Sequence, residues 1–222
     1  LCYGPNIADW PEMQSLKDNL IMKVAAKIDD AVTTTDELIP SGETSSYRSN
    51  PLRLAEFTLS RKRPDYVGKA KKIAEDALSE SLPDEYAEAV KLTNTDGSIE
   101  IGSVIYAVKP GDGSAREQAA SCQRVLGGVA NIAKEYATKR YRSNLINWGM
   151  LPFIYDGDDI LCDDIIVVKD VKKVFDEGKT DAYVVRNGQV KKIVLRMDAV
   201  TAREKEIILA GCLINANRKD VK

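Results

Sequence analysis

Short apolar runs alternate with helical patterns along this chain, and this alternation restricts its fold more than any other feature of the sequence. Apolar runs typical of buried strands lie at 20–28, 101–108, 129–133, 165–168, 182–185 and 191–195. Between them, apolar residues recur at spacings of three and four, as around Ile73 and Ala77 and again at 201–213, which indicates amphipathic helices. A capping box of Thr201 and Glu204 would begin the helix at 201–213, and a further helix is predicted at 135–149. Turns are predicted at 94–97 and, between two strands, at Asn187-Gly188. Such alternation is typical of α/β domains. We therefore predict a mixed sheet flanked by helices.

The length of 222 residues permits one large domain or two small ones. Residues 1–19 contain Pro5, Trp10 and Pro11 without a clear period, so we expect a linker or arm there. Residues 20–222 are expected to form the folded domain. Because the chain starts at Leu1 and not at a methionine, we also expect a fragment or a processed product.

The composition excludes several classes of function. The chain has no histidine, so Ser-His-Asp and Cys-His catalysis cannot occur within it. Its four cysteines show no C-x-x-C spacing, and we expect no metal site on this chain. The net charge of −2 provides no basic field for nucleic acid, and no apolar run approaches the roughly 20 residues of a membrane span. We therefore expect a cytoplasmic protein that binds neither nucleic acid nor a membrane.

The junction at 109–117, with the sequence KPGDGSARE, is the strongest candidate for a binding site, because it joins a predicted strand to a predicted helix. A proline and two glycines end the strand. Ser114 and Glu117 fit a capping box, which predicts that the helix begins at Ser114. The free N–H groups of that helix, its dipole and Arg116 would all favour an anion. The simpler alternative is that Ser114 only caps the helix.

Polar segments elsewhere supply further candidates. Thr34, Thr35 and Asp36 follow the first predicted strand, and the polar loop at 41–50 contains a single cation, Arg48. Polar loops of this length inside a domain are more often functional than idle, although a solvated surface loop is the alternative. The acidic segment at 156–164 lacks the full calcium-loop pattern, so we interpret it as a turn.

Four segments together resemble the C-terminal swivel domain of the aconitase family. They are Thr34-Thr35-Asp36, Ser46-Tyr47-Arg48, the run GDGSAREQAA at 111–120 and the run NLINWGMLP at 144–152. The resemblance implies a swivelling β/β/α domain that closes over a catalytic body of three other domains, from which residues 1–19 would lead. It also implies a hydro-lyase that interconverts citrate and isocitrate, or similar hydroxy acids, on a [4Fe–4S] cluster held by that body.

The resemblance assigns roles to individual residues. Ser114 corresponds to the family's catalytic serine, whose alkoxide removes a proton from the carbon beside a carboxylate. Arg116 and Arg48 correspond to arginines that bind substrate carboxylates, a task that suits a planar guanidinium. Asp36 corresponds to an active-site aspartate that orients a partner or assists proton transfer.

Two positions depart from the family pattern and leave the substrate open. Ala115 replaces a second serine that would donate a hydrogen bond to substrate, and Glu37 stands where most aconitases have a histidine. The resemblance therefore points to a divergent bacterial-type hydratase branch.

Three hypotheses about function follow. In the leading one, the chain is the C-terminal domain of a fused aconitase-like enzyme, inactive alone, whose partners are the cluster-bearing domains 1–3 and a small carboxylic acid. The second is a free-standing small subunit, as in isopropylmalate isomerase. The third is a non-catalytic module that binds anions or another protein.

Overall fold

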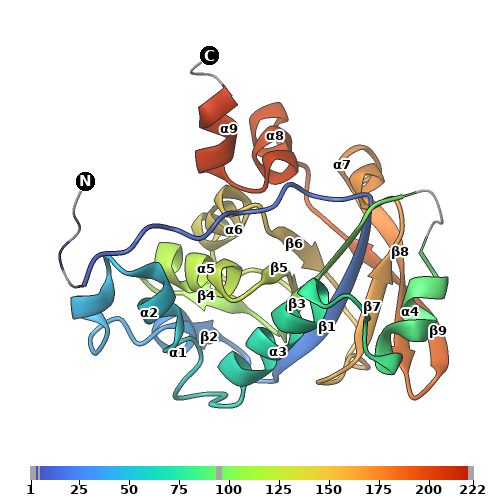
Figure 1. Ribbon diagram of the computed structural model, residues 1–222, viewed down its shortest axis with the longest axis horizontal. Coiled ribbons are helices and arrows are strands. Elements are labelled where there is room, and N and C mark those ends of the chain that lie inside the picture. The colour runs from blue at the N-terminus through green and yellow to red at the C-terminus, as the bar shows by residue number, and fades with distance from the viewer. Residues whose placement is uncertain (1–3, 5, 94–96, 220–222) are drawn as a thin grey trace.

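The computed structural model describes Gly4 and residues 6–93 and 97–219 (Figure 1). Its strands are β1 (Asn19–Ile28), β2 (Thr33–Thr34), β3 (Ile99–Ala107), β4 (Pro110–Asp112), β5 (Gly128–Ala133), β6 (Leu151–Ile154), β7 (Ile165–Val168), β8 (Lys179–Arg186) and β9 (Gln189–Arg196). Its α-helices are α1 (Thr35–Leu38), α2 (Pro51–Ala55), α3 (Tyr66–Leu78), α4 (Ala87–Lys91), α5 (Arg116–Val125), α6 (Lys139–Asn147), α7 (Val174–Glu177), α8 (Ala202–Ala210) and α9 (Leu213–Lys219). Short 3-10 helices are η1 (Ser45–Tyr47), η2 (Asp84–Tyr86) and η3 (Val171–Lys173).

A mixed sheet forms the centre of the molecule. β1, β3, β5 and β6 are neighbours and run parallel, whereas β7, β8 and β9 continue from the other edge of β1 in antiparallel order. The pair Ile154 and Arg196 joins β6 to β9, so the sheet closes on itself. Helices surround this sheet in Figure 1. The predicted α/β fold, with a mixed sheet flanked by helices, is confirmed.

Because of a bulge in β1, side chains of this one strand pack into two different hydrophobic cores. Leu20, Met22 and Val24 belong to the core that all the strands of the closed sheet share. The register of β1 against β3 shifts between Val24 and Ala26. Because an extra residue reverses the alternation of side chains, Ala26 and Ile28 belong instead to an outer core beneath α1, α2, α3, α5 and α6. The helices that carry the candidate site rest on this outer core.

Two predicted helices differ from the structure at their ends. The helix predicted at 135–149 begins at Lys139, because Thr138 caps α6 by accepting a hydrogen bond from the Tyr141 N–H. The helix predicted at 201–213 does begin with the capping box of Thr201 and Glu204. Gly211 then adopts a left-handed conformation that ends α8, and α9 follows. The turn predicted at 94–97 lies largely outside the described residues.

Residues 6–18 form an arm that crosses the domain between the α8–α9 pair and the helices α5 and α6 (Figure 1). Met13 is buried in the outer core. The Leu16 N–H donates to the carbonyl of Leu209 in α8 at 3.3 Å, and the Asn215 side chain in α9 donates to the Met13 carbonyl at 2.9 Å. The arm therefore packs on the domain that follows it, and its origin in a preceding catalytic body stays a prediction.

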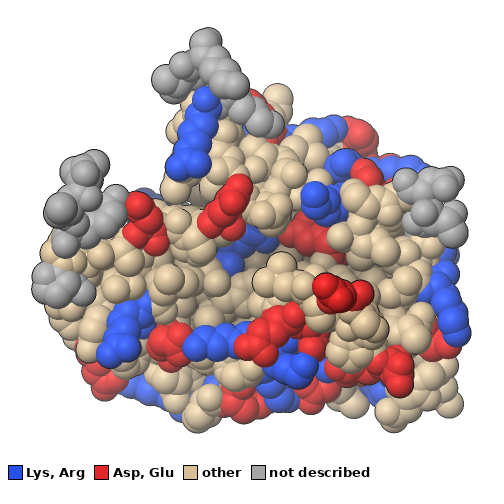
Figure 2. Space-filling model, in the orientation of Figure 1, with Lys and Arg blue, Asp and Glu red and all other residues tan. Residues whose placement is uncertain are grey.

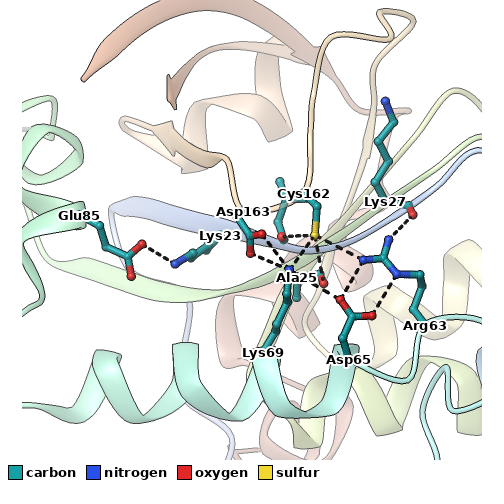
Figure 3. A network of polar contacts seen from close by, with 10 residues as sticks. Lys23, Ala25, Lys27, Arg63, Asp65, Lys69, Glu85, Cys162 and Asp163 are labelled. Carbon is teal, nitrogen blue, oxygen red and sulfur yellow. Dashed lines mark hydrogen bonds and ion pairs between the residues drawn. The ribbon is translucent and has the colours of Figure 1, made fainter. Parts of the chain in front are cut away.

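A polar network fastens the loop before β7 to α3 and β1 (Figure 3). Lys69 of α3 lies 2.8 Å from the Asp163 carboxylate and 3.2 Å from the Cys162 Sγ. Arg63, just before α3, donates to the carbonyl of Lys27 in β1 at 2.8 Å. These contacts join a helix, a strand and a loop that lie far apart in the sequence.

Charges of both signs alternate on the surface. On the face seen in Figure 2, Lys and Arg side chains lie among Asp and Glu side chains along the lower part. Lys71, for example, pairs with Glu56 at 2.5 Å. This face therefore offers no extended basic patch of the kind that nucleic acids bind. Within the described ranges, each helix falls short of the length and apolar character that crossing a bilayer requires.

Candidate functional site

Two short parallel strands bring the separate candidate segments together. β2 pairs with β4, with Thr33 opposite Pro110 and Thr34 opposite Asp112. α1 follows β2 directly, and α5 begins shortly after β4. The segment that carries Asp36 and the loop that carries Ser114 are therefore neighbours, as the carboxyl ends of adjacent parallel strands must be.

β4 and the loop that leads from it to α5 lie so close to their surroundings that one position in each requires glycine. Gly111 has φ +97°, and a Cβ there would collide with the ring of Tyr141. Gly113 has φ +128°, and a Cβ there would collide with the Thr35 hydroxyl. Only glycine combines these dihedral angles with such close approach. The backbone path before Ser114 is thus fixed by packing on α1 and α6.

The predicted capping box at Ser114 is wrong. α5 begins at Arg116, Ala115 occupies the N-cap position, and no side chain caps this end of the helix. The Ala115 N–H donates to the Thr35 Oγ1 at 3.2 Å, so a tertiary contact sets the start of the helix. Glu117, the other half of the expected box, accepts a hydrogen bond from the Trp148 Nε1 at 2.6 Å instead.

This correction leaves Ser114 available for chemistry. Its side chain is exposed and forms no hydrogen bond with any described residue. The first N–H groups of α5 also lack a side-chain cap, so they can meet an anion beside the Ser114 hydroxyl. The alternative in which Ser114 only caps the helix does not hold in this structure.

Arg116 stands in the first turn of α5 and is partly buried. Its Nε is buried without a hydrogen-bond partner, and its guanidinium forms no ion pair within the described ranges. Buried guanidinium N–H groups normally have a partner, because desolvating them otherwise costs free energy. An anionic ligand at the start of α5 would supply the missing acceptor.

Asp36 lies in the first turn of α1 and is held from two sides. Its carboxylate accepts a hydrogen bond from the Ser41 N–H at 3.1 Å and pairs with Arg61 at 3.1 Å. Arg61 pairs in turn with Glu43 at 2.5 Å. This small network fixes the orientation of Asp36 next to the loop that carries Ser114.

Arg48 follows η1 in the polar loop and is exposed. It forms no hydrogen bond or ion pair with Ser114, Arg116 or any other described residue. The helix that comes next, α2, packs against α5 in the outer core through Leu54. The fold thus places the Arg48 loop on the same group of helices as Arg116, without a direct contact between the two arginines.

A buried triad of polar side chains connects the elements that carry the candidate site. The Tyr141 hydroxyl accepts a hydrogen bond from the Gln123 Nε2 at 2.9 Å and donates to the Asn131 Oδ1 at 3.1 Å. The Asn131 Nδ2 donates to the Gln123 Oε1 at 2.7 Å. Burial raises the pKa of Tyr141 above its usual range, so the hydroxyl stays a neutral donor. The triad ties α5, α6 and β5 together.

Sequence reasoning assigned no individual role to three residues that shape the candidate site. Thr35 joins α1 to Ala115, and the repeated threonines before Asp36 were the available signal. Trp148 binds Glu117, and its only signal was its place in the run at 144–152. Arg61, which holds Asp36, lies in a stretch of mixed pattern and gave no signal.

The cysteines of the described residues do not fit an iron–sulfur cluster. A cluster requires several converging thiolates. Burial raises the pKa of the Cys122 thiol to about 12. The Cys162 thiol contacts the side chains of Lys69 and Arg63. Cys212 lies far from both of these cysteines in the sequence. No group of three or more Cys, Asp or Glu side chains that could hold a metal gathers within the described ranges.

Comparisons with known proteins agree with this architecture. The family model of the aconitase C-terminal domain matches residues 72–157. The methanogen homoaconitase small subunit of Methanocaldococcus jannaschii is 34% identical over 127 residues, which cover 57% of this chain and 68% of that protein. A crystal structure of 3-isopropylmalate dehydratase from the same organism superposes with a TM-score of 0.57 at 26% identity, over 91% of this chain and 95% of the other. The chain therefore belongs to the aconitase C-terminal domain family.

Proposed function

We propose that this chain is the small subunit of a hydro-lyase that reversibly dehydrates a hydroxy di- or tricarboxylic acid, with Ser114 as catalytic base. The observation that carries the proposal is the state of Ser114, an exposed hydroxyl without a partner among the described residues, beside the uncapped start of α5. The similarity to a homoaconitase small subunit and to 3-isopropylmalate dehydratase supports this class of reaction. It also favours a small subunit over the fused enzyme.

Ser114 would act on the C–H bond next to a substrate carboxylate. A serine hydroxyl is a weak base, so its alkoxide must be stabilised before it can remove such a proton. The positive end of α5 and the Arg116 guanidinium favour a negative charge at this position. The alkoxide takes the proton, the C–H electron pair forms the double bond, and the neighbouring C–O bond breaks with its electron pair going to the departing hydroxide. That hydroxide takes up a proton from solvent and leaves as water, and Ser114 returns its proton to solvent before the next turnover. Hydration is the reverse.

Arg116 and Arg48 would bind two substrate carboxylates. Each guanidinium is free of intramolecular ion pairs within the described ranges, and a guanidinium can donate two parallel hydrogen bonds to one carboxylate. Asp36, already held by Ser41 and Arg61, would orient the groups around the Ser114 loop. Ala115 offers substrate no hydroxyl, which favours an acid that differs from citrate near this position.

The departing hydroxyl would be handled by a partner subunit. In this family a [4Fe–4S] cluster serves as Lewis acid, and the described cysteines do not fit one. We therefore assign the cluster to a larger subunit that this chain would cover. This chain would contribute the proton transfer at Ser114 and the binding of the substrate carboxylates.

Replacing Ser114 tests the proposal. In the complex with a cluster-bearing subunit, Ser114→Ala should lower kcat by about 10²- to 10⁴-fold, the usual contribution of a general base, while KM changes little. Steady-state dehydration of homocitrate, isopropylmalate and citrate would measure it. Ser143→Ala, at a half-buried position of α6, is the matched control and should keep the wild-type rate.

Wild-type activity in Ser114→Ala would overturn the assignment of the base. The non-catalytic alternative predicts a different pattern, in which the isolated chain binds tricarboxylates but no complex turns them over. Binding that is unaffected by both Arg48→Ala and Arg116→Ala would argue against a substrate site of either kind.

A further inference from the structure

The arm of residues 6–18 reaches both segments that carry the proposed carboxylate-binding arginines. Near its start, the Ala8 N–H donates to the carbonyl of Ser49 at 3.0 Å, directly after Arg48. Further along, the Trp10 ring lies against the Trp148 ring, with centroids 4.3 Å apart and planes at 41°. Two elements that are remote from residues 6–18 in sequence are thus held by one short segment (Figure 1).

Trp148 continues the connection to Arg116. Its ring is only 6% exposed, and its Nε1 donates to the Glu117 Oε1 at 2.6 Å. Glu117 follows Arg116 in the first turn of α5. A short hydrogen bond from an indole to a carboxylate is charge-assisted and directional. This bond restrains the first turn of α5 together with the bond from the Ala115 N–H to the Thr35 Oγ1.

The middle of the arm is anchored where it cannot shift easily. The Arg124 side chain, near the end of α5, donates to the Gln14 carbonyl at 2.9 Å. Gly211 packs so closely on that carbonyl that a Cβ would collide with it. Gly149, next to Trp148, packs in the same way on the Gly211 carbonyl. The arm, the end of α6 and the end of α8 therefore lock together around Trp148.

We propose that residues 8–14 form a positioning strap, in which Trp10 and Trp148 fix Arg116 through Glu117 while Ala8 fixes the Arg48 loop. The inference rests on the proposed function, because it treats the two arginines as the carboxylate-binding groups. Both arginines have long side chains with many rotamers, so a dicarboxylate binds well only when their backbones are held in place. The strap restrains both backbones at once. Trp10, Trp148 and Glu117 are positioning residues that do not touch substrate.

Two substitutions test the strap from either end. Trp148→Phe keeps the ring and removes the N–H donor, whereas Trp10→Ala removes the stacked ring from a side chain that is 40% exposed. In the complete enzyme Trp148→Phe should raise KM about tenfold, as expected for the loss of one charge-assisted hydrogen bond, and Trp10→Ala about threefold to tenfold, as expected for the loss of one aromatic pair. Both should leave kcat within about twofold. Glu117→Gln keeps an acceptor for the indole but loses the charge assistance, so its KM should rise less than that of Trp148→Phe. Glu12→Gln, on the same arm, is the matched control.

Hydrogen exchange of the free chain supplies a measurement that needs no activity. Trp148→Phe and Trp10→Ala should speed amide exchange at 114–118, and Trp10→Ala also at 48–50, while exchange in β1 and β3 stays at wild-type rates. Faster exchange throughout the chain would instead indicate general destabilisation and would overturn the strap. Unchanged exchange at 114–118, or a loss of kcat without a change in KM, would do the same.

The two proposals fail in distinguishable ways. If Ser114→Ala stays active while the tryptophan variants raise KM, the assignment of the base is wrong and the strap holds. If Ser114→Ala loses activity while the tryptophan variants match wild type in KM and in exchange, the proposed function holds and the strap is wrong.

Discussion

Arg116 has a buried Nε without a partner among the described residues, a costly arrangement unless a ligand supplies the acceptor. Ser114, two positions earlier, has an exposed hydroxyl beside the same helix start. The binding of an anion requires a cation without a partner, and the removal of a proton requires an accessible hydroxyl. Arg116 and Ser114 meet these two requirements among the described residues.

Arg116→Lys tests the binding role at this scale. Lysine keeps the charge but cannot donate two parallel hydrogen bonds, so KM should rise about 10- to 100-fold with a smaller change in kcat. Steady-state kinetics of the complete enzyme would measure it. Arg218→Lys, an exposed position on α9, is the control and should change neither constant. An unchanged KM in Arg116→Lys would show that no carboxylate binds there bidentately.

Among the elements, α1 is short and depends on its cap. The Glu37 carboxylate accepts the Thr34 N–H at 2.7 Å and lies 3.2 Å from the Lys62 Nζ. These contacts, the Thr34 N–H first, lower the pKa of Glu37. The charged form is therefore favoured in the folded state. Its contribution to stability is present above the unfolded pKa of about 4.3 and is lost as the pH falls through the lower folded value.

Glu37→Gln isolates that charge, because glutamine can still complete the capping box. At pH 7 the variant should be less stable by at most about 1 kcal/mol, since Glu37 is 34% exposed and solvent screens the pair with Lys62. The difference from wild type should shrink as the pH falls below about 4.3. Urea unfolding at pH 7, 5 and 4 would measure it, with the exposed Glu80→Gln as control. A difference that grows towards acid pH would contradict the sign of the shift.

At the scale of the whole molecule, the site is open and incomplete. Ser114 and Arg48 are exposed, and no set of metal-binding side chains gathers within the described ranges. The proposed dehydration, which would use a Lewis acid in an enclosed site, would place a second body over this surface. The similarity to a homoaconitase small subunit is consistent with such a partner.

This predicts that neither partner is active alone. The isolated chain should turn over no hydroxy acid, and activity should appear on adding a cluster-bearing large subunit and level off at equimolar ratio. Titration of one partner into the other, followed by absorbance of the unsaturated acid, would measure it. Turnover by the isolated chain would refute the need for a partner.

The sequence by itself determined the features that depend on neighbouring residues. The apolar runs predicted β1, β3, β5, β7, β8 and β9 to within a few residues, and Asn187-Gly188 predicted the hairpin turn, where both residues have positive φ. The box of Thr201 and Glu204 predicted the start of α8. Such signals act over about four residues, so they can be read without knowing the fold.

Only the tertiary structure decided which partners the polar groups take. The same capping-box pattern that holds at Thr201 fails at Ser114, because the Ala115 N–H binds Thr35 and Glu117 binds Trp148. The sequence also did not predict the path of the arm or the pairing of Asp36 with Arg61. These partners come from distant segments that packing brings together, and local propensity carries no information about them. A threonine far along the chain, and not Ser114 itself, receives the amide at the start of the helix, which leaves the Ser114 hydroxyl exposed for its proposed role.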